Sequence, residues 1–355
     1  MMNLADKLAQ KYITPYKRRF PVITASGVPG AFDEKAVDIP FVFFHRGQYH
    51  MLYTGFDGIS YQSALAVSSD LMNWTFKGMV TRREEGSGHW YSLGAAGTWI
   101  VKENDDLHAV PRPGKKDGRY WMTFHAHPCK GYEEGPAEIG LAWTEDEELL
   151  DWHFSDKPIL SWKDGADWEK GGLYKSCLVE KDGCWYLFYN AKNEDIYWIE
   201  QTGVAVSEDF IHWKRIGSEP VLAVQKGNWD QRFLSEPCII RDGDYWLNFY
   251  FGFDGKHAQE GFAVSRDLIH WEKAEEPLLT YGAEGEYDSV HAHKASVIAV
   301  DGTLYHYYCG VRPSQEGDVS ESCGEYRTIM AASSRRWPDQ EGSKGEVYER
   351  TKMHS

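Results

Sequence analysis

One short unit of sequence, repeated along the chain, constrains the fold more than any other feature. In residues 235–271 an apolar strand leads into an Asp242-Gly243 turn, an aromatic strand and a third strand follow, and the unit closes on Trp271. The Asp-Gly pair is a strong hairpin signal because glycine tolerates a positive φ. The unit therefore predicts a small antiparallel sheet of three or four strands with a tryptophan at its outer end.

The same unit recurs elsewhere in the chain, each time closing on a tryptophan. The other copies span residues 38–74, 109–152, 175–213 and, more weakly, 294–337. A sheet of this size cannot bury its own faces, so repeats of this length are typical of a propeller with one sheet per blade. Five copies predict an all-β chain folded as a five-bladed β-propeller with a short N-terminal helix. A β-sandwich with chance similarity between the units is the alternative.

The repeats leave no linker between them. We therefore expect the 355 residues to contain one closed domain, although length alone favours two. The predicted parts are an N-terminal helix and entry segment, a catalytic propeller and a C-terminal tail, at residues 1–34, 35–340 and 341–355.

The N-terminal segment is expected to form an amphipathic helix over residues 3–19. Leu4, Leu8 and Tyr12 lie on one face of this helix. Such a face packs on the propeller or on a second subunit, and in the second case the protein would be a homo-oligomer.

The composition restricts the partners. Lys and Arg number 38 against 54 Asp and Glu, which gives a net charge of −16. Affinity for nucleic acid rests on neutralising phosphates, so neither nucleic acid nor an anionic membrane surface is expected. The N-terminal segment lacks the apolar core of a secretory signal, and no run approaches the roughly 18 apolar residues of a membrane helix. These absences predict a cytoplasmic protein.

The first strand of each propeller blade lines the central channel, so residues at the starts of these strands converge on one end of the axis. Here they are Asp38, His108, Tyr174, Lys175, Glu236, His291, His293 and Lys294. Burying charges without partners is costly, which indicates a function for the set. Two carboxylates across a pocket, Asp38 and Glu236, are what glycoside hydrolysis requires: one protonates the leaving oxygen and the other activates water or attacks the sugar. Lys175 or His293 beside one carboxylate would keep it ionised.

Aromatic side chains are the expected sugar-binding surfaces. A long loop over residues 81–108 carries Trp90 and Trp99. Long loops in compact domains are often functional, so this loop is expected to close one side of the channel, with a cover over a sheet edge as the alternative. Trp229, just before the fourth unit, is the third candidate for stacking on a sugar.

Metal binding has little support. His125, His127 and Cys129 lie close together, but their spacing matches no strong zinc pattern. We predict no metal ligands and no required cofactor, while a calcium or other ion on the axis stays open.

The blade endings have the form Ser-x-Asp-Leu-x-x-Trp, as in residues 68–74 and 265–271. With these endings the chain resembles the five-bladed glycoside hydrolases of families 43, 32, 62, 68 and 117, over about residues 36–337. The resemblance implies that Asp38, at the opening of the first blade, is the base or nucleophile. It also implies that Glu236, in the Ser-Glu-Pro sequence that opens the fourth blade, is the acid.

Two departures from the family pattern bear on the acid. Families 43 and 32 place an aspartate at the start of the third blade to orient and tune the acid, where this chain has Tyr174-Lys175-Ser176. Family 117 uses a histidine from the region of the fifth blade as the acid, and His293 lies there. The resemblance thus leaves the acid open between Glu236 and His293, and it implies an outlying branch of the group.

These observations predict an exo-acting glycosidase that cleaves a short plant or algal oligosaccharide. A glycoside phosphorylase on the same scaffold is one alternative, and Lys175, Lys294 and Arg312 would form its phosphate site. A propeller that binds sugar without turnover is the other. Fold analogy alone does not decide among them.

Overall fold

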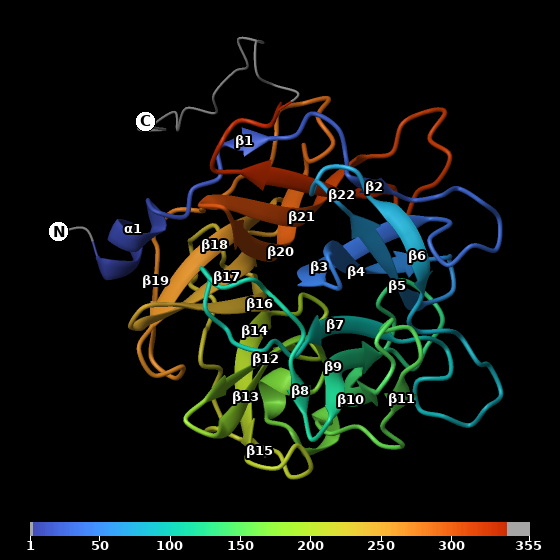
Figure 1. The fold of residues 1–355 in the computed structure, drawn as a ribbon, viewed down its shortest axis with the longest axis vertical. Helices are drawn as coiled ribbons and strands as arrows, with labels where there is room; N and C mark the ends of the chain where they lie inside the picture. The colour runs from blue at the N-terminus through green and yellow to red at the C-terminus, as the bar shows by residue number, and fades with distance from the viewer. Residues whose placement is uncertain (1–2, 339–355) are drawn as a thin grey trace.

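The computed structural model describes residues 3–338 and contains almost no helix (Figure 1). Its helical segments are α1 (Leu4–Ala9) and two single 3-10 turns, η1 (Trp162–Asp164) and η2 (Asp167–Glu169). The remaining regular structure is β-strand, so the predicted all-β class is confirmed. None of the helices in this part of the chain is long and apolar enough to cross a membrane.

The strands of the described residues form five antiparallel groups, numbered here in chain order. Group 1 contains β3 (Ala36–His45), β4 (Gln48–Phe56), β5 (Tyr61–Ser68) and β6 (Thr75–Met79). Group 2 contains β7 (Ala96–Ile100), β8 (Lys115–Lys116), β9 (Arg119–Ala126), β10 (Glu138–Thr144) and β11 (His153–Phe154). Group 3 contains β12 (Gly172–Lys181), β13 (Cys184–Lys192), β14 (Glu200–Ser207) and β15 (Lys214–Arg215).

The last two groups lie in the C-terminal half. Group 4 contains β16 (Phe233–Asp242), β17 (Tyr245–Phe253), β18 (Ala258–Ser265) and β19 (Trp271–Lys273). Group 5 contains β20 (His291–Val300), β21 (Thr303–Pro313) and β22 (Glu325–Ser333), with β1 (Tyr16–Lys17) and β2 (Ile23–Thr24) from the N-terminal segment.

The first strands of the groups are neighbours around one centre (Figure 1). β3 contacts β7, β7 contacts β12, β12 contacts β16, β16 contacts β20, and β20 contacts β3. Single parallel residue pairs, Glu200 with Phe233 and Ala258 with His291, also connect groups 3, 4 and 5. This arrangement brings the starts of the first strands to the same end of the molecule.

The repeated Ser-x-Asp sequence builds the turn after the third strand of a group. In group 4, Ser265 Oγ accepts hydrogen bonds from the N–H groups of Asp267 (3.1 Å) and Leu268 (2.9 Å). Asp267 Oδ1 accepts another from Ile269 N–H at 2.9 Å, and Trp271 Nε1 donates to Leu268 O at 3.2 Å. The same Ser and Asp bonds recur in residues 68–73 and 207–213. The motif therefore recurs because each group needs this turn.

The helix predicted over residues 3–19 ends at Ala9. Beyond it the chain extends, and both β1 and β2 pair with β22. Pro15 disfavours helix at the residue before it, and the exposed edge of β22 offers backbone groups that need partners. The N-terminal segment thus supplies the outer strands of group 5.

The apolar face of α1 and the residues after it packs on group 4. Leu8 and Tyr12 are buried. The Tyr12 ring stacks on Phe262 at 5.3 Å, and its hydroxyl donates to Asp242 at 2.6 Å. The face that the sequence offered to either the propeller or a second subunit therefore contacts the same chain.

The second unit begins earlier than predicted. Its first strand is β7, and the segment after residue 108 contributes only the short β8, which pairs with β9. Pro111 and Pro113 lack the N–H groups that a sheet ladder needs, so this segment does not form an inner strand. His108, predicted at the channel, instead lies after β7, is 66% exposed and approaches Asp242 at 3.3 Å.

Candidate active site

A bulge interrupts the first strand of every group in the described chain. In four of these strands the bulged residue has a positive φ: Ile39 (49°), Lys175 (50°), Glu236 (51°) and Lys294 (68°). Side-chain-bearing residues are strained there by on the order of 1–3 kcal/mol each, and such strain gathers at functional sites. A bulge also redirects the side chain it carries. Lys175, Glu236 and Lys294 are consequently buried together at one end of the first strands; we call them and Asp38 the axial cluster.

Asp38 precedes the bulge of β3 and is 1% exposed. Its Oδ2 accepts hydrogen bonds from Lys294 Nζ and, at 3.1 Å, from the Tyr132 hydroxyl, and it lies 3.5 Å from Arg327 Nη1. Burial by itself would raise the pKa of Asp38, but the positive charges of Lys294 and Arg327 hold that pKa well below its usual range. This carboxylate is therefore ionised at neutral pH.

Glu236 has the opposite environment. It is 7% exposed, and its Oε2 has no hydrogen-bond partner among the described residues. Burial raises the pKa of Glu236 to about 8, although Lys175 and Lys294 oppose the shift. The axial cluster thus holds one ionised carboxylate, Asp38, and one carboxyl group that keeps its proton at neutral pH.

A loop from group 2, residues 127–137 between β9 and β10, covers the axial cluster. Glu133 Oε1 lies 3.1 Å from Lys175 Nζ and 3.6 Å from Lys294 Nζ, and it accepts a hydrogen bond from the Tyr61 hydroxyl at 3.0 Å. Burial alone would raise the pKa of Glu133, but the two lysines hold it well below its usual range. This loop touches the axial cluster, a place that the sequence had assigned to residues 81–108.

His293 lies beside the bulge of β20 and is 5% exposed. Its ring packs edge-on against Phe251 with centroids 5.1 Å apart, and its Nδ1 is 3.1 Å from Cys309 O. Burial holds the pKa of His293 well below 6.5, so the ring is neutral at pH 7. As a proton donor it is therefore the weaker of the two predicted acids.

His291 and Tyr174 complete the set from the strand starts. His291 Nδ1 accepts from Ala258 N–H at 2.9 Å, and its Nε2 lies 3.5 Å from Glu325 Oε1. Tyr174 is 1% exposed, its ring lies 5.3 Å from Lys175 Nζ, and burial raises the pKa of its hydroxyl well above 10. Both residues border the axial cluster.

His125 and His127 lie beside Tyr174, with ring centroids 6.2 and 6.1 Å from its ring. Burial lowers the pKa of both imidazoles, that of His127 to about 4. Within residues 3–338 no set of three or more His, Cys, Asp or Glu side chains is placed to hold a metal ion.

The predicted stacking residues are Trp90, Trp99 and Trp229. Trp90 stacks on Phe124 at 5.1 Å, Trp99 is 4% exposed and packs on Phe41 at 4.7 Å, and Trp229 stacks on Tyr250 at 5.9 Å. Each indole face is thus already in contact with another ring of the sheets. These contacts are between strands and do not involve the axial cluster.

Arg312 does not join the two lysines. Its guanidinium forms a two-pronged pair with Asp318 at 2.7 and 2.9 Å and lies over the ring of Tyr326 at 4.3 Å. The arginine that reaches Asp38 is Arg327, from β22.

Three contributors to the site were missed from the sequence: Tyr132, Glu133 and Arg327. The repeats contain a signal for the arginine. Six residues before the serine that ends the third strand stand glutamines in groups 1, 3 and 4 and an arginine in group 5: Gln62, Gln201, Gln259 and Arg327. Tyr132 and Glu133 lie in a loop without counterpart in the other copies, so no repeat could reveal them.

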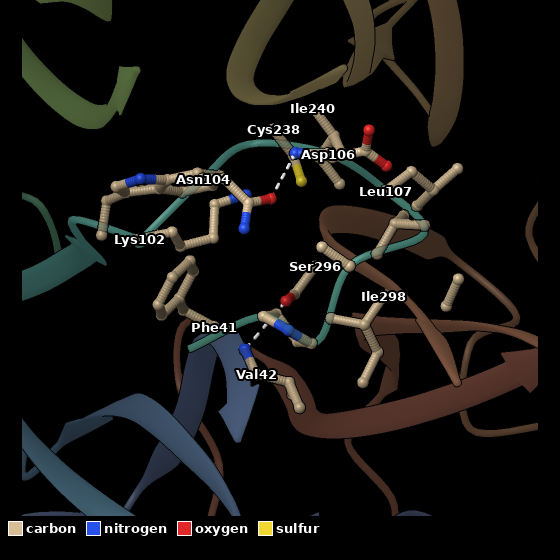
Figure 2. A pocket seen from close by; sticks show the side chains of 15 residues that line it. Phe41, Val42, Lys102, Asn104, Asp106, Leu107, Cys238, Ile240, Ser296 and Ile298 are labelled. Carbon is tan, nitrogen blue, oxygen red and sulfur yellow. Dashed lines mark hydrogen bonds between the residues drawn. The ribbon is translucent and has the colours of Figure 1, made fainter. Parts of the chain in front are cut away.

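A small pocket lies further along the first strands (Figure 2). It is lined by Phe41, Trp99, Lys102, Cys238 and Ser296, among others, and Ser296 Oγ accepts from Val42 N–H at 2.9 Å. About 20 Å³ of it is open to the centre of a water-sized sphere, which is room for roughly one water. This pocket is too small for a sugar ring.

No family model matches the chain. Among curated proteins it is 29% identical over 174 residues to a 1,2-β-oligomannan phosphorylase of Thermoanaerobacter sp. (strain X514), covering 43% of this chain and 57% of that protein. It is 28% identical over 134 residues to a β-1,2-mannobiose phosphorylase of the same organism, covering 33% of this chain and 43% of that protein. The chain spans about half the length of these relatives.

Solved structures match over nearly the whole chain. One, described as a complex of BT0996 and RGII, has a TM-score of 0.78 and 29% identity over 94% of this chain and 96% of that one. Another, described as a glycoside hydrolase, has a TM-score of 0.78 and 28% identity over 93% and 94%. A family-43 and a family-117 glycoside hydrolase, 18% and 12% identical, share the fold at TM-scores of 0.60 and 0.64. The chain therefore has the fold of the propeller-type glycoside hydrolases that its sequence resembles, and its relatives include hydrolases and phosphorylases.

Proposed function

We propose that this protein is a glycosidase that removes sugars from the end of a short oligosaccharide. One observation carries the proposal: two buried carboxyl groups on β3 and β16 have opposite protonation at neutral pH, with Asp38 ionised and Glu236 protonated. Glycoside cleavage needs such a pair, because the leaving oxygen must receive a proton while the anomeric carbon is attacked or water is activated.

The roles follow from the two environments. Glu236 is the general acid: its carboxyl proton goes to the glycosidic oxygen as the bond to the sugar breaks. Asp38 is the base that takes a proton from the attacking water, or the nucleophile if the sugar is first transferred to the protein. His293, neutral and packed against Phe251, positions the sugar or the neighbouring groups.

The architecture that supports this site is a closed five-bladed propeller. We take each of the five strand groups as one blade, with β1 and β2 completing the last. The contact of β20 with β3 supports this reading, since it joins the last group to the first. The loop of residues 127–137 over the axial cluster favours a pocket closed on one side, which suits attack on a chain end.

Phosphorolysis is the second candidate. Two observations favour it: Lys175 and Lys294 converge on one carboxylate oxygen of Glu133, as they would on a phosphate oxygen, and the curated relatives are phosphorylases. In that reaction phosphate replaces water as the attacking group, and the product is a sugar phosphate.

The test is a screen of aryl glycosides and β-1,2-linked mannosides, each with and without inorganic phosphate. Release of free sugar that is indifferent to phosphate identifies a hydrolase, and release of sugar phosphate that requires phosphate identifies a phosphorylase. Sugar binding without turnover, unchanged in Asp38→Asn and Glu236→Ala, would leave only a sugar-binding propeller.

A further inference from the structure

The closed loop leaves the proposed reacting groups without access. Asp38 is 1% and Glu236 7% exposed. The Tyr132 hydroxyl donates directly to the Asp38 oxygen that a sugar or water would have to approach. Because a substrate must touch both carboxyl groups to react, the loop of residues 127–137 has to move away before it binds.

The loop is built so that its centre can move. Gly131 (φ 132°) and Gly135 (φ 77°) flank Tyr132 and Glu133 in a conformation that favours glycine. A Cβ at Gly131 would lie 2.3 Å from the side chain of Glu134, so no larger residue fits the closed form. The bonds of this centre to the axial cluster are made by two side chains, Tyr132 to Asp38 and Glu133 to the lysines.

Movement of Glu133 changes the charge of the site. Lys175 is 3% exposed, and its ion pair in the described residues is with Glu133. Lys294 keeps Asp38 when Glu133 leaves. A lysine that a bound sugar shields from water and that has lost its counter-charge is strongly destabilised. A neutral sugar alone would leave Lys175 in that position.

We propose that Lys175 and Lys294 form an anion-binding subsite, which the carboxylate of Glu133 fills while the loop is closed and an anionic group of the substrate or co-substrate fills when the loop opens. This inference rests on the proposed function for its meaning in catalysis. The internal carboxylate acts as a competitor, so each anion must displace it.

The chemistry of the ligand follows from what it replaces. Glu133 presents one oxygen to both ammonium groups, so the replacement carries a negative charge and an oxygen that reaches two donors. The carboxylate of a uronic acid unit and inorganic phosphate both meet this requirement. The first would make the enzyme specific for acidic sugars, and the second would make it a phosphorylase.

The test measures binding rather than turnover, by titration calorimetry in a buffer without phosphate or carboxylates. Glucuronate and inorganic phosphate are titrated separately into the wild-type protein, Glu133→Gln, Glu134→Gln and Lys175→Met. Removing the competing carboxylate should tighten at least one anion about tenfold or more in Glu133→Gln, since apparent affinity scales with the fraction of open site. Lys175→Met should abolish that binding.

Glu134→Gln is the matched control: it removes the same charge one residue away from an exposed position. Tightening of glucuronate alone assigns the subsite to sugar carboxylates, and tightening of phosphate alone assigns it to phosphate. Anion affinity that is the same in Glu133→Gln, Glu134→Gln and the wild type overturns the proposal.

A second measurement uses the unaltered protein and decides the matter if Glu133→Gln does not fold. Hydrogen exchange of peptides covering residues 127–137 should rise when the bound anion releases the loop. Exchange that is unchanged at concentrations up to about 100 mM of either anion, the range of weak single-anion sites, counts against the subsite. Neither result depends on catalysis, so a protein that binds anions but cleaves no glycoside would refute the proposed function and keep the subsite.

Discussion

The hydroxyl of Tyr132 donates a hydrogen bond to Asp38 Oδ2 over 3.1 Å, which places a loop of group 2 directly on the buried carboxylate of group 1. The guanidinium of Arg327 lies over the same tyrosine ring at 4.8 Å and also approaches Asp38. Closure of the loop and the charge state of the site therefore involve the same side chains.

Tyr132→Phe should loosen the closed loop. The substitution keeps the ring packing and removes one hydrogen bond to a charged group, which contributes about 1.5 kcal/mol. Amide exchange in residues 127–137 should therefore rise about tenfold, as measured by mass spectrometry. Tyr245→Phe is the control, because its hydroxyl accepts from Arg266 at the surface. Equal exchange in both variants would show that the bond does not hold the loop.

Asp38→Asn should reduce turnover by at least about 100-fold, the usual scale for a lost acid–base group. It should also lower stability by on the order of 3–5 kcal/mol, because Lys294 and Arg327 stay buried with less counter-charge. Assays must therefore be run below the melting temperature of the variant. Asp117→Asn, an exposed turn residue with a φ of 53°, is the control. Near-normal turnover in folded Asp38→Asn would refute its role.

The pH profile of kcat/KM should fall above about pH 8. Burial raises the pKa of Glu236 from 4.5 to about 8, so the proposed acid keeps its proton up to that pH and loses it above. The acidic limb should lie far lower, because the pKa of Asp38 is depressed. A fall in activity centred near the ordinary histidine pKa of about 6.5 would instead indicate a histidine.

The same shift has a consequence for stability. The native state favours the protonated form of Glu236, so its contribution to stability is fully present below pH 4.5 and is lost as the pH rises through 8. Glu236→Gln cannot ionise and escapes this loss. Its melting temperature relative to the wild type should rise between about pH 5 and pH 8, and a constant difference would mean that Glu236 titrates normally.

Deletion of residues 1–19 should lower the melting temperature by about 5 °C or more. The deletion removes α1 and β1 and uncovers the ring of Phe262; losing buried aromatic contacts costs several kcal/mol, and each kcal/mol shifts the midpoint by about 2 °C in a large domain. The sedimentation mass should stay that of the full chain less the deleted residues, in the same oligomeric state. A drop to a lower oligomer would restore the subunit contact predicted from the sequence.

The sequence was sufficient where structure is set locally and then repeated. The Ser-x-Asp turns are made by hydrogen bonds between residues two or three apart, so their spacing can be recognised without a fold. Since equivalent positions in equivalent strands meet at one end, Asp38, Lys175 and Glu236 could be brought together from the repeats alone.

The sequence was insufficient where the partner of a side chain comes from a unique segment. Glu133 and Tyr132 lie in a loop of one group, and only the folded protein shows that they reach Lys175 and Asp38. Trp90 and Trp99 have the composition of sugar platforms, yet their faces pack on other rings, because an aromatic pattern does not say what lies opposite it. The strand β7 was missed since the two prolines after it drew the predicted start of group 2 too far along the chain.

The most direct test of the central claim is a leaving-group comparison on Glu236→Ala and His293→Ala. Loss of the general acid slows substrates with poor leaving groups far more than activated ones, because only the former need a proton in the transition state. We predict that Glu236→Ala loses activity on a natural oligosaccharide but keeps much of it on a dinitrophenyl glycoside, and that azide or formate partly restores it, while His293→Ala slows both substrates alike. Leaving-group dependence in His293→Ala and its absence in Glu236→Ala would contradict the assignment and make the histidine the acid.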